Sequence, residues 1–147
     1  MAEPPLWRCP TCGQTFVTRN MPHSCQVVAL DDHFAAAPGL RAVFDAYLAA
    51  ARECGPVTVN ATTSRISFQV RMRFAGIERP RRSHINATFV LTRAIQSDRV
   101  RVEFIEPRYY VHRLVLHSPE DVDAEVRSWL SEAYAVGEQK HLRRLPG

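Results

Sequence analysis

The residues best suited to chemistry are three cysteines and one histidine near the N-terminus. Cys9 and Cys12 are separated by two residues and followed by Gly13, and His23 and Cys25 come after a spacer. A Cys-x-x-Cys-Gly segment is typical of a zinc knuckle, because the glycine permits a tight turn that points backbone amides at the sulfurs. Three thiolates and one imidazole are a standard closed set for structural zinc. We therefore predict one structural zinc ion bound by Cys9, Cys12, His23 and Cys25.

The identity of the fourth ligand stays open at this point. His23 and Cys25 are closer together than the second pair of a zinc knuckle usually is, so Cys54 competes with His23. Cys54 follows a predicted helix, where a buried thiol is the simpler interpretation. Four protein ligands leave no open position for a substrate, so a catalytic zinc is disfavoured. We predict no catalytic residue.

A second group of candidates comes from a run of alternating residues over 65–74. Apolar side chains occupy every second position, and Arg65, Arg71 and Arg73 fall on the opposite side. Together with His112, these arginines are candidates for an anion-binding or ligand-binding cleft. The alternatives are a solvated face in which Glu103 pairs with the arginines, or a surface for nucleic acid. For His112 the competing interpretation is a hydrogen-bonded histidine of the core.

The elements that must position these residues can be read from hydrophobic periodicity. Residues 40–51 carry an apolar stripe with helical spacing, which Gly55 and Pro56 end. Ser118, Pro119 and Asp121 predict the start of a last helix with a capping box, and Gly137 ends it. The strands are predicted at 57–62, 65–74, 85–91, 100–105 and 109–117. Short connections favour an α+β fold: an antiparallel sheet of about five strands, covered on one face by two helices, with an N-terminal zinc knuckle.

Composition bounds the domain organisation and the cellular setting. The chain has 147 residues and 46% hydrophobic side chains, enough for one domain. We predict a zinc-binding head over 1–29 and an α+β domain over 30–147, packed as a single compact unit. The chain begins without a secretory signal and has no apolar run near the roughly 20 residues of a membrane span, so we expect a cytoplasmic protein that is not bound to membranes.

The functional expectation is a non-enzymatic, zinc-containing binding module for an unknown ligand or protein partner. One alternative is a small enzyme or a binder of anionic small molecules that uses the cleft of arginines and His112. The other is nucleic-acid binding through the zinc head and the arginine-rich face. The net charge of +4 favours none of these, because the arginines are spread along the chain.

Several segments together resemble a known family. They are W-R-C-P-T-C-G-Q-T-F with P-H-S-C, D-D-H-F, G-P-V, R-I-S-F-Q and W-L-S-E-A-Y-A-V-G. In these the chain is similar, from Trp7 to about Leu142, to bacterial proteins of the domain-of-unknown-function family numbered 5655. The resemblance implies the α+β fold and the Cys/His head, and it implies no activity. The family often has a lysine just before the R-I pair, where this chain has Thr63, so an anion site that depends on that lysine is not implied here.

Overall fold

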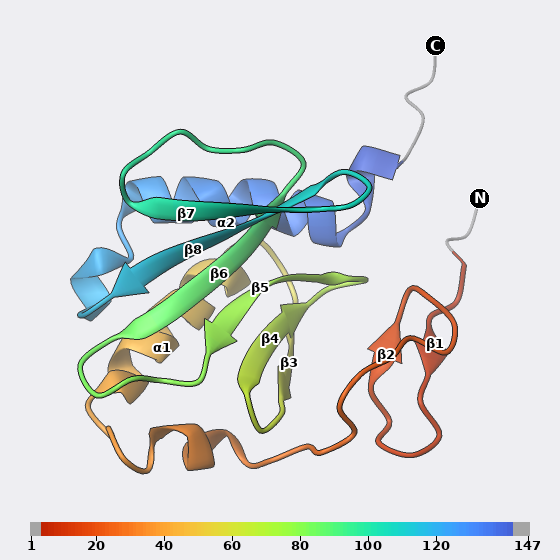
Figure 1. Ribbon diagram of the computed structural model, residues 1–147, viewed down its shortest axis with the longest axis horizontal. Coiled ribbons are helices and arrows are strands. Elements are labelled where there is room, and N and C mark those ends of the chain that lie inside the picture. Colours follow the sequence, from red (N-terminus) through yellow and green to blue (C-terminus); the bar gives the residue numbers. More distant parts are fainter. Residues whose placement is uncertain (1–3, 143–147) are drawn as a thin grey trace.

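The computed structural model describes residues 4–142, and its main feature is a six-stranded antiparallel sheet (Figure 1). The sheet has the order β3-β4-β5-β6-β8-β7. Its strands are β3 (Thr58–Ala61), β4 (Arg65–Gln69), β5 (Arg73–Glu78), β6 (Ile85–Leu91), β7 (Val100–Ile105) and β8 (Tyr109–Leu116). A separate two-stranded hairpin, β1 (Trp7–Arg8) and β2 (Thr15–Phe16), precedes it. The α+β class is therefore confirmed, with one more strand in the main sheet than expected.

Two α-helices cover one face of this sheet, as predicted (Figure 1). They are α1 (Leu40–Arg52) and α2 (Ala124–Gly137). Three short 3-10 segments are also present: η1 (Leu30–Phe34) before α1, η2 (Pro119–Asp121) before α2 and η3 (Lys140–Leu142) after α2. The predicted stripe of α1 is buried, and Phe44 and Tyr47 pack their rings on Phe68 of β4. Between residues 4 and 142, no helix combines the length and apolar character that crossing a membrane requires.

The segment 65–74 is not one strand, as the alternation predicted, but a hairpin of β4 and β5. The backbone turns at 70–72, where the N–H groups of Arg71 and Met72 donate to the Gly137 carbonyl at 3.2 and 3.0 Å. A Cβ atom at Gly137 would lie 2.7 Å from Val70 Cγ1, so the glycine permits this close approach. The turn is thus held by the end of α2, a distant contact that local alternation cannot reveal.

The start of the last helix also differs from the prediction. The capping box of Ser118 and Asp121 exists, but it caps the short η2 segment. The α-helix begins at Ala124, and Asp123 is its N-cap, because its side chain accepts a hydrogen bond from the Val126 N–H at 3.0 Å. Two consecutive capping signals lie within a few residues, and the sequence alone did not separate them.

Candidate metal centre and the adjoining trough

The predicted ligands Cys9, Cys12, His23 and Cys25, here called the metal cluster, come together in the loops around β1 and β2. Their ligand atoms all lie within 4.8 Å of one another. Cys9 Sγ is 3.8 Å from Cys25 Sγ, and His23 Nε2 is 3.3 Å from the Sγ atoms of both Cys12 and Cys25. The four residues therefore lie close enough to bind one metal ion.

The spacing within the cluster fits a tetrahedral ion. Two thiolates bound at the usual Zn–S distance of about 2.3 Å lie about 3.8 Å apart at tetrahedral corners, and a thiolate and an imidazole lie about 3.6 Å apart. The observed distances of 3.8 and 3.3 Å are close to these values. Cys54 is not part of the cluster, because its Sγ faces the Ala50 carbonyl at the end of α1. His23 rather than Cys54 therefore completes the group.

The turn of the Cys-x-x-Cys-Gly segment lowers the pKa values of the first two thiols, Cys9 and Cys12, which favours the thiolate forms that bind cations. The Gly13 N–H donates to the Cys9 carbonyl at 2.9 Å, and Gly13 has a φ of 80°, a conformation that favours glycine. A hydrogen bond from the backbone N–H of Cys12 lowers the pKa of Cys9 to about 6. Burial works against ionisation of Cys12, but hydrogen bonds from Gln14 lower its pKa overall. Burial raises the pKa of Cys25 to about 11, so this third thiol would need the charge of a bound cation in order to ionise near neutral pH.

The imidazole of His23 is oriented by its own neighbours. Its Nδ1–H donates to the Met21 carbonyl at 2.6 Å, which leaves the Nε2 lone pair facing the sulfurs. The ring also packs on Phe16, with ring centres 4.5 Å apart, and Phe16 in turn contacts Trp7. The aromatic pair of Trp7 and Phe16 therefore lies beside the metal cluster and contacts the ring of His23.

Gln14 and Arg73 connect the metal cluster to the sheet. The Gln14 side-chain amide donates to Cys12 Sγ at 3.2 Å and to the Ser24 carbonyl at 2.8 Å, while its Oε1 accepts from Arg73 at 3.0 Å. The Arg73 guanidinium also donates to the Thr15 carbonyl and lies 4.1 Å from the Phe16 ring centre. The head is thus held on β5 by a cation that is itself bonded to the surroundings of the metal cluster.

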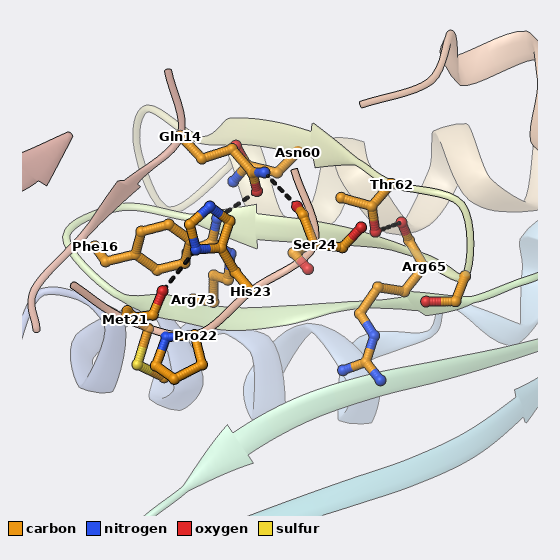
Figure 2. A pocket seen from close by; sticks show the side chains of 12 residues that line it. Gln14, Phe16, Met21, Pro22, His23, Ser24, Asn60, Thr62, Arg65 and Arg73 are labelled. Carbon is orange, nitrogen blue, oxygen red and sulfur yellow. Dashed lines mark hydrogen bonds between the residues drawn. The ribbon is translucent and has the colours of Figure 1, made fainter. Parts of the chain in front are cut away.

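Beside this contact, two adjoining cavities form a trough on the outer face of the sheet, which is the face opposite the helices. The cavity next to the head has a volume of about 380 Å³ and the one over the sheet about 320 Å³. Figure 2 shows the first cavity, with Phe16 and His23 on the head side and Asn60 and Arg65 on the sheet side. Both cavities are lined by Arg65, Ser67 and Arg73.

The structure brings only two of the four predicted anion-binding residues into this trough, Arg65 and Arg73. Arg71 lies in the β4–β5 turn, where its guanidinium donates to Gln139 Oε1 and to the Pro4 carbonyl. His112 is fully buried on the helix side of the sheet. The cleft of three arginines and His112 is therefore not formed, because 65–74 folds as a hairpin and β8 turns His112 inward.

Glu103 does not pair with the predicted arginines either. Its carboxylate bonds to Arg113 at 3.3 Å, and Arg113 also bonds to Glu78 at 2.6 Å. Arg113 lies next to Glu103 because β8 is inserted between β6 and β7. The cross-strand ion-pair network expected on this face exists, but it is centred on Arg113.

His112 is a hydrogen-bonded core histidine, the competing interpretation of the sequence. Its Nδ1–H donates to the Tyr110 carbonyl at 3.1 Å, and its Nε2 accepts the Ile95 N–H at 2.9 Å. The ring stacks on Phe89 with centres 4.8 Å apart. Burial lowers the pKa of His112, since a charged ring would be desolvated and would have to give up the bond from Ile95.

This burial predicts a pH-dependent stability. Because the pKa of His112 is lower in the folded protein than its usual value of about 6.5, the unfolded chain binds the additional proton as the pH falls below that value. The free energy of unfolding should therefore decrease in that range. The variant His112→Gln can keep an acceptor for Ile95 but does not titrate, so its decrease should be smaller. Urea unfolding at a series of pH values measures both slopes.

The exposed His117 provides the matched control, because His117→Gln makes the same change outside the core. A His112→Gln variant with the wild-type dependence of unfolding free energy on pH would contradict this account of His112.

Several residues of the site were not predicted from the sequence. Gln14 and Ser67 are ordinary polar residues there, and only Gln14 carries a local signal, since it directly follows the Cys-x-x-Cys-Gly segment. Ser67 lies on the face predicted to be polar but was indistinguishable from other exposed serines. Their roles depend on which strands meet the head.

Comparison with known protein families identifies one family that matches this chain. Residues 30–137 match a family described as Domain of unknown function (DUF5655). The match begins after the metal cluster, so it does not extend to the Cys/His head. Searches of curated proteins and of solved structures each found no match. Since the matched segment is most of the chain, the protein belongs to the DUF5655 family.

Proposed function

We propose that this protein is a zinc-stabilised binding module of the cytoplasm, whose ligand occupies the trough between the head and the outer face of the sheet. The observation that carries the proposal is the bonded path from Cys12 through Gln14 to Arg73. Because Arg73 lines both cavities, a metal ion that orders the head also completes one end of the trough.

The zinc would be structural. Cys9, Cys12, His23 and Cys25 supply four ligands, which satisfies the usual tetrahedral shell of a structural site. Such an ion provides folding free energy to a segment that lacks a hydrophobic core. The main core cluster begins at Phe34, and within the head (1–29) Val28 is the first described residue packed against it, which supports treating the metal-binding part of the head as separately stabilised. The start of the family match at residue 30 supports the same boundary.

Binding is favoured over catalysis because the acid–base groups of the trough are already engaged. Glu78 and Glu103 both bond to Arg113, and His23 belongs to the metal cluster. Nucleic-acid binding has less support, since single-stranded ligands need exposed aromatic side chains for base stacking. Phe16, the aromatic residue that lines the trough, is buried under Arg73.

Metal analysis tests the first half of the proposal. Protein purified without chelators should contain about one zinc ion per chain. Cobalt substitution should give the thiolate-to-cobalt charge-transfer absorption of a site with three sulfurs, and removal of the metal with a chelator should disorder the head. Freshly purified protein without bound metal, which also fails to bind added zinc or cobalt, would contradict the proposal.

A further inference from the structure

The two cavities of the trough share three lining residues, Arg65, Ser67 and Arg73, here called the waist. The floor beside them crosses three strands, since Ser67 is paired with Gly76 and Gly76 with Thr88. Gly76 has no side chain to fill the middle of this floor. The waist is therefore a recess with a cation on each side of a serine hydroxyl.

The two cations of the waist differ in what already neutralises them. Arg73 bonds to the neutral acceptors Gln14 and Thr15, and it faces the metal cluster, where three thiolates and one divalent cation would leave a net negative charge. Within residues 4–142 the Arg65 guanidinium makes no hydrogen bond or ion pair, whereas the Arg65 carbonyl is engaged by Thr62. The cross-strand neighbour of Arg65, Glu78, bonds to Arg113 at 2.6 Å. The donors of the Arg65 guanidinium are thus the ones at the waist that a ligand can engage, although Glu78 and Glu103 share the single cation Arg113 nearby.

The two cavities beside the waist suit different parts of a ligand. Glu78 and Glu103 line the cavity over the sheet and would repel an anion placed deep in it. The cavity beside the head has no carboxylate among its lining residues and combines polar groups with apolar ones, including Asn60, Met21 and Pro22. Its volume of about 380 Å³ lies in the range of about 300–1,000 Å³ typical of small-molecule sites.

From these observations we propose that the waist binds the carboxylate or phosphate of a small organic anion, whose uncharged body lies in the cavity beside the head. This inference rests on the proposed function, since the head forms one wall of that cavity. Arg65 provides the charge-assisted hydrogen bonds to the anionic group, and Ser67 adds a hydroxyl donor from the floor. Arg73 keeps the wall of the head in place.

An NMR titration of the zinc-loaded protein tests this site with defined probes. Inorganic phosphate, phenyl phosphate and benzoate are compared with benzamide, an uncharged molecule of similar shape to benzoate. Benzoate and phenyl phosphate should shift the backbone amide signals of Ser67 and Gly76 in a saturable way, and benzamide should not. Phosphate alone should bind more weakly than phenyl phosphate, because it lacks the body that fills the cavity beside the head.

The variant Arg65→Ala should weaken binding of phenyl phosphate by about tenfold or more, as expected when a hydrogen-bonding partner of a charged group is lost. Arg101→Ala is the matched control, because it removes an exposed arginine from the edge strand β7, outside both cavities. It should retain wild-type affinity. Zinc content is measured for each variant and should not change.

Two results would overturn the anion site. One is a zinc-loaded wild-type protein in which no anionic probe shifts Ser67 and Gly76 at millimolar concentration, and the other is an Arg65→Ala variant with wild-type affinity. In either case bound zinc would leave the metal part of the proposed function standing. Conversely, absence of zinc with saturable binding at the waist would contradict the proposed function and leave the anion site intact.

Discussion

Replacing Cys9 with serine is expected to remove the metal ion and to unfold the head, while the six-stranded sheet and its helices stay folded. Cys9 is buried within the metal cluster, and a serine hydroxyl does not replace a thiolate as a zinc ligand. Metal affinity in a structural site supplies the folding free energy of the segment around it. The bound zinc should therefore fall from about one ion per chain to a small fraction of that.

The remainder should keep its fold because its stability has another source. Phe44, Tyr47 and Phe68 are fully buried between the sheet and α1 and belong to the main core cluster, which does not include Cys9. Limited proteolysis of Cys9→Ser should thus cut within 4–29 and leave a resistant fragment that unfolds cooperatively. NMR amide signals of β4 to β8 should remain dispersed.

Cys54→Ser is the matched control for this experiment. It makes the same chemical change at a thiol that lies outside the metal cluster, so the variant should keep its zinc and its ordered head. Loss of zinc in Cys54→Ser would make Cys54 a ligand after all. If Cys9→Ser unfolded the whole chain, the head would be an integral part of the core, and the division at residue 29 would be wrong.

The largest destabilisation from a single added methyl group is expected for Gly76→Ala. An ideal Cβ atom at Gly76 would lie 2.2 Å from the Ile66 carbonyl oxygen and 3.0 Å from Ser67 Cα, both backbone atoms of the adjoining strand. Backbone in the middle of a sheet cannot move aside as a flexible side chain can. We expect a loss of about 3 kcal/mol or more in the free energy of unfolding, at the upper end of what overpacking costs.

Gly39→Ala provides the comparison, since a Cβ atom there meets nothing within 4 Å and the residue has an ordinary helical φ of −64°. Its unfolding free energy should stay within about 1 kcal/mol of the wild type. Urea unfolding followed by circular dichroism measures both variants. A Gly76→Ala variant as stable as Gly39→Ala would mean that β4 and β5 are not paired as described.

The sequence by itself determined the features that local chemistry controls. The metal cluster could be predicted because Cys9, Cys12 and Cys25 lie close together in the chain and few other arrangements bring three thiols and an imidazole to one point. The helix α1 could be predicted because its burial repeats with the helical period. For the same reason three strands agree with their predicted ranges almost to the residue: β6, β7 and β8.

Only the tertiary structure decided which surfaces meet. Period-two alternation says which residues are buried but not where a strand turns, and the turn between β4 and β5 is fixed by the distant Gly137 carbonyl. Because of that turn, Arg71 does not lie on the polar face of the sheet. Because β8 lies between β6 and β7, Glu103 forms its ion pair with Arg113. The trough exists because Arg73 meets Gln14 across 59 positions of the sequence. Such contacts follow from the packing of whole elements, and no local pattern encodes them.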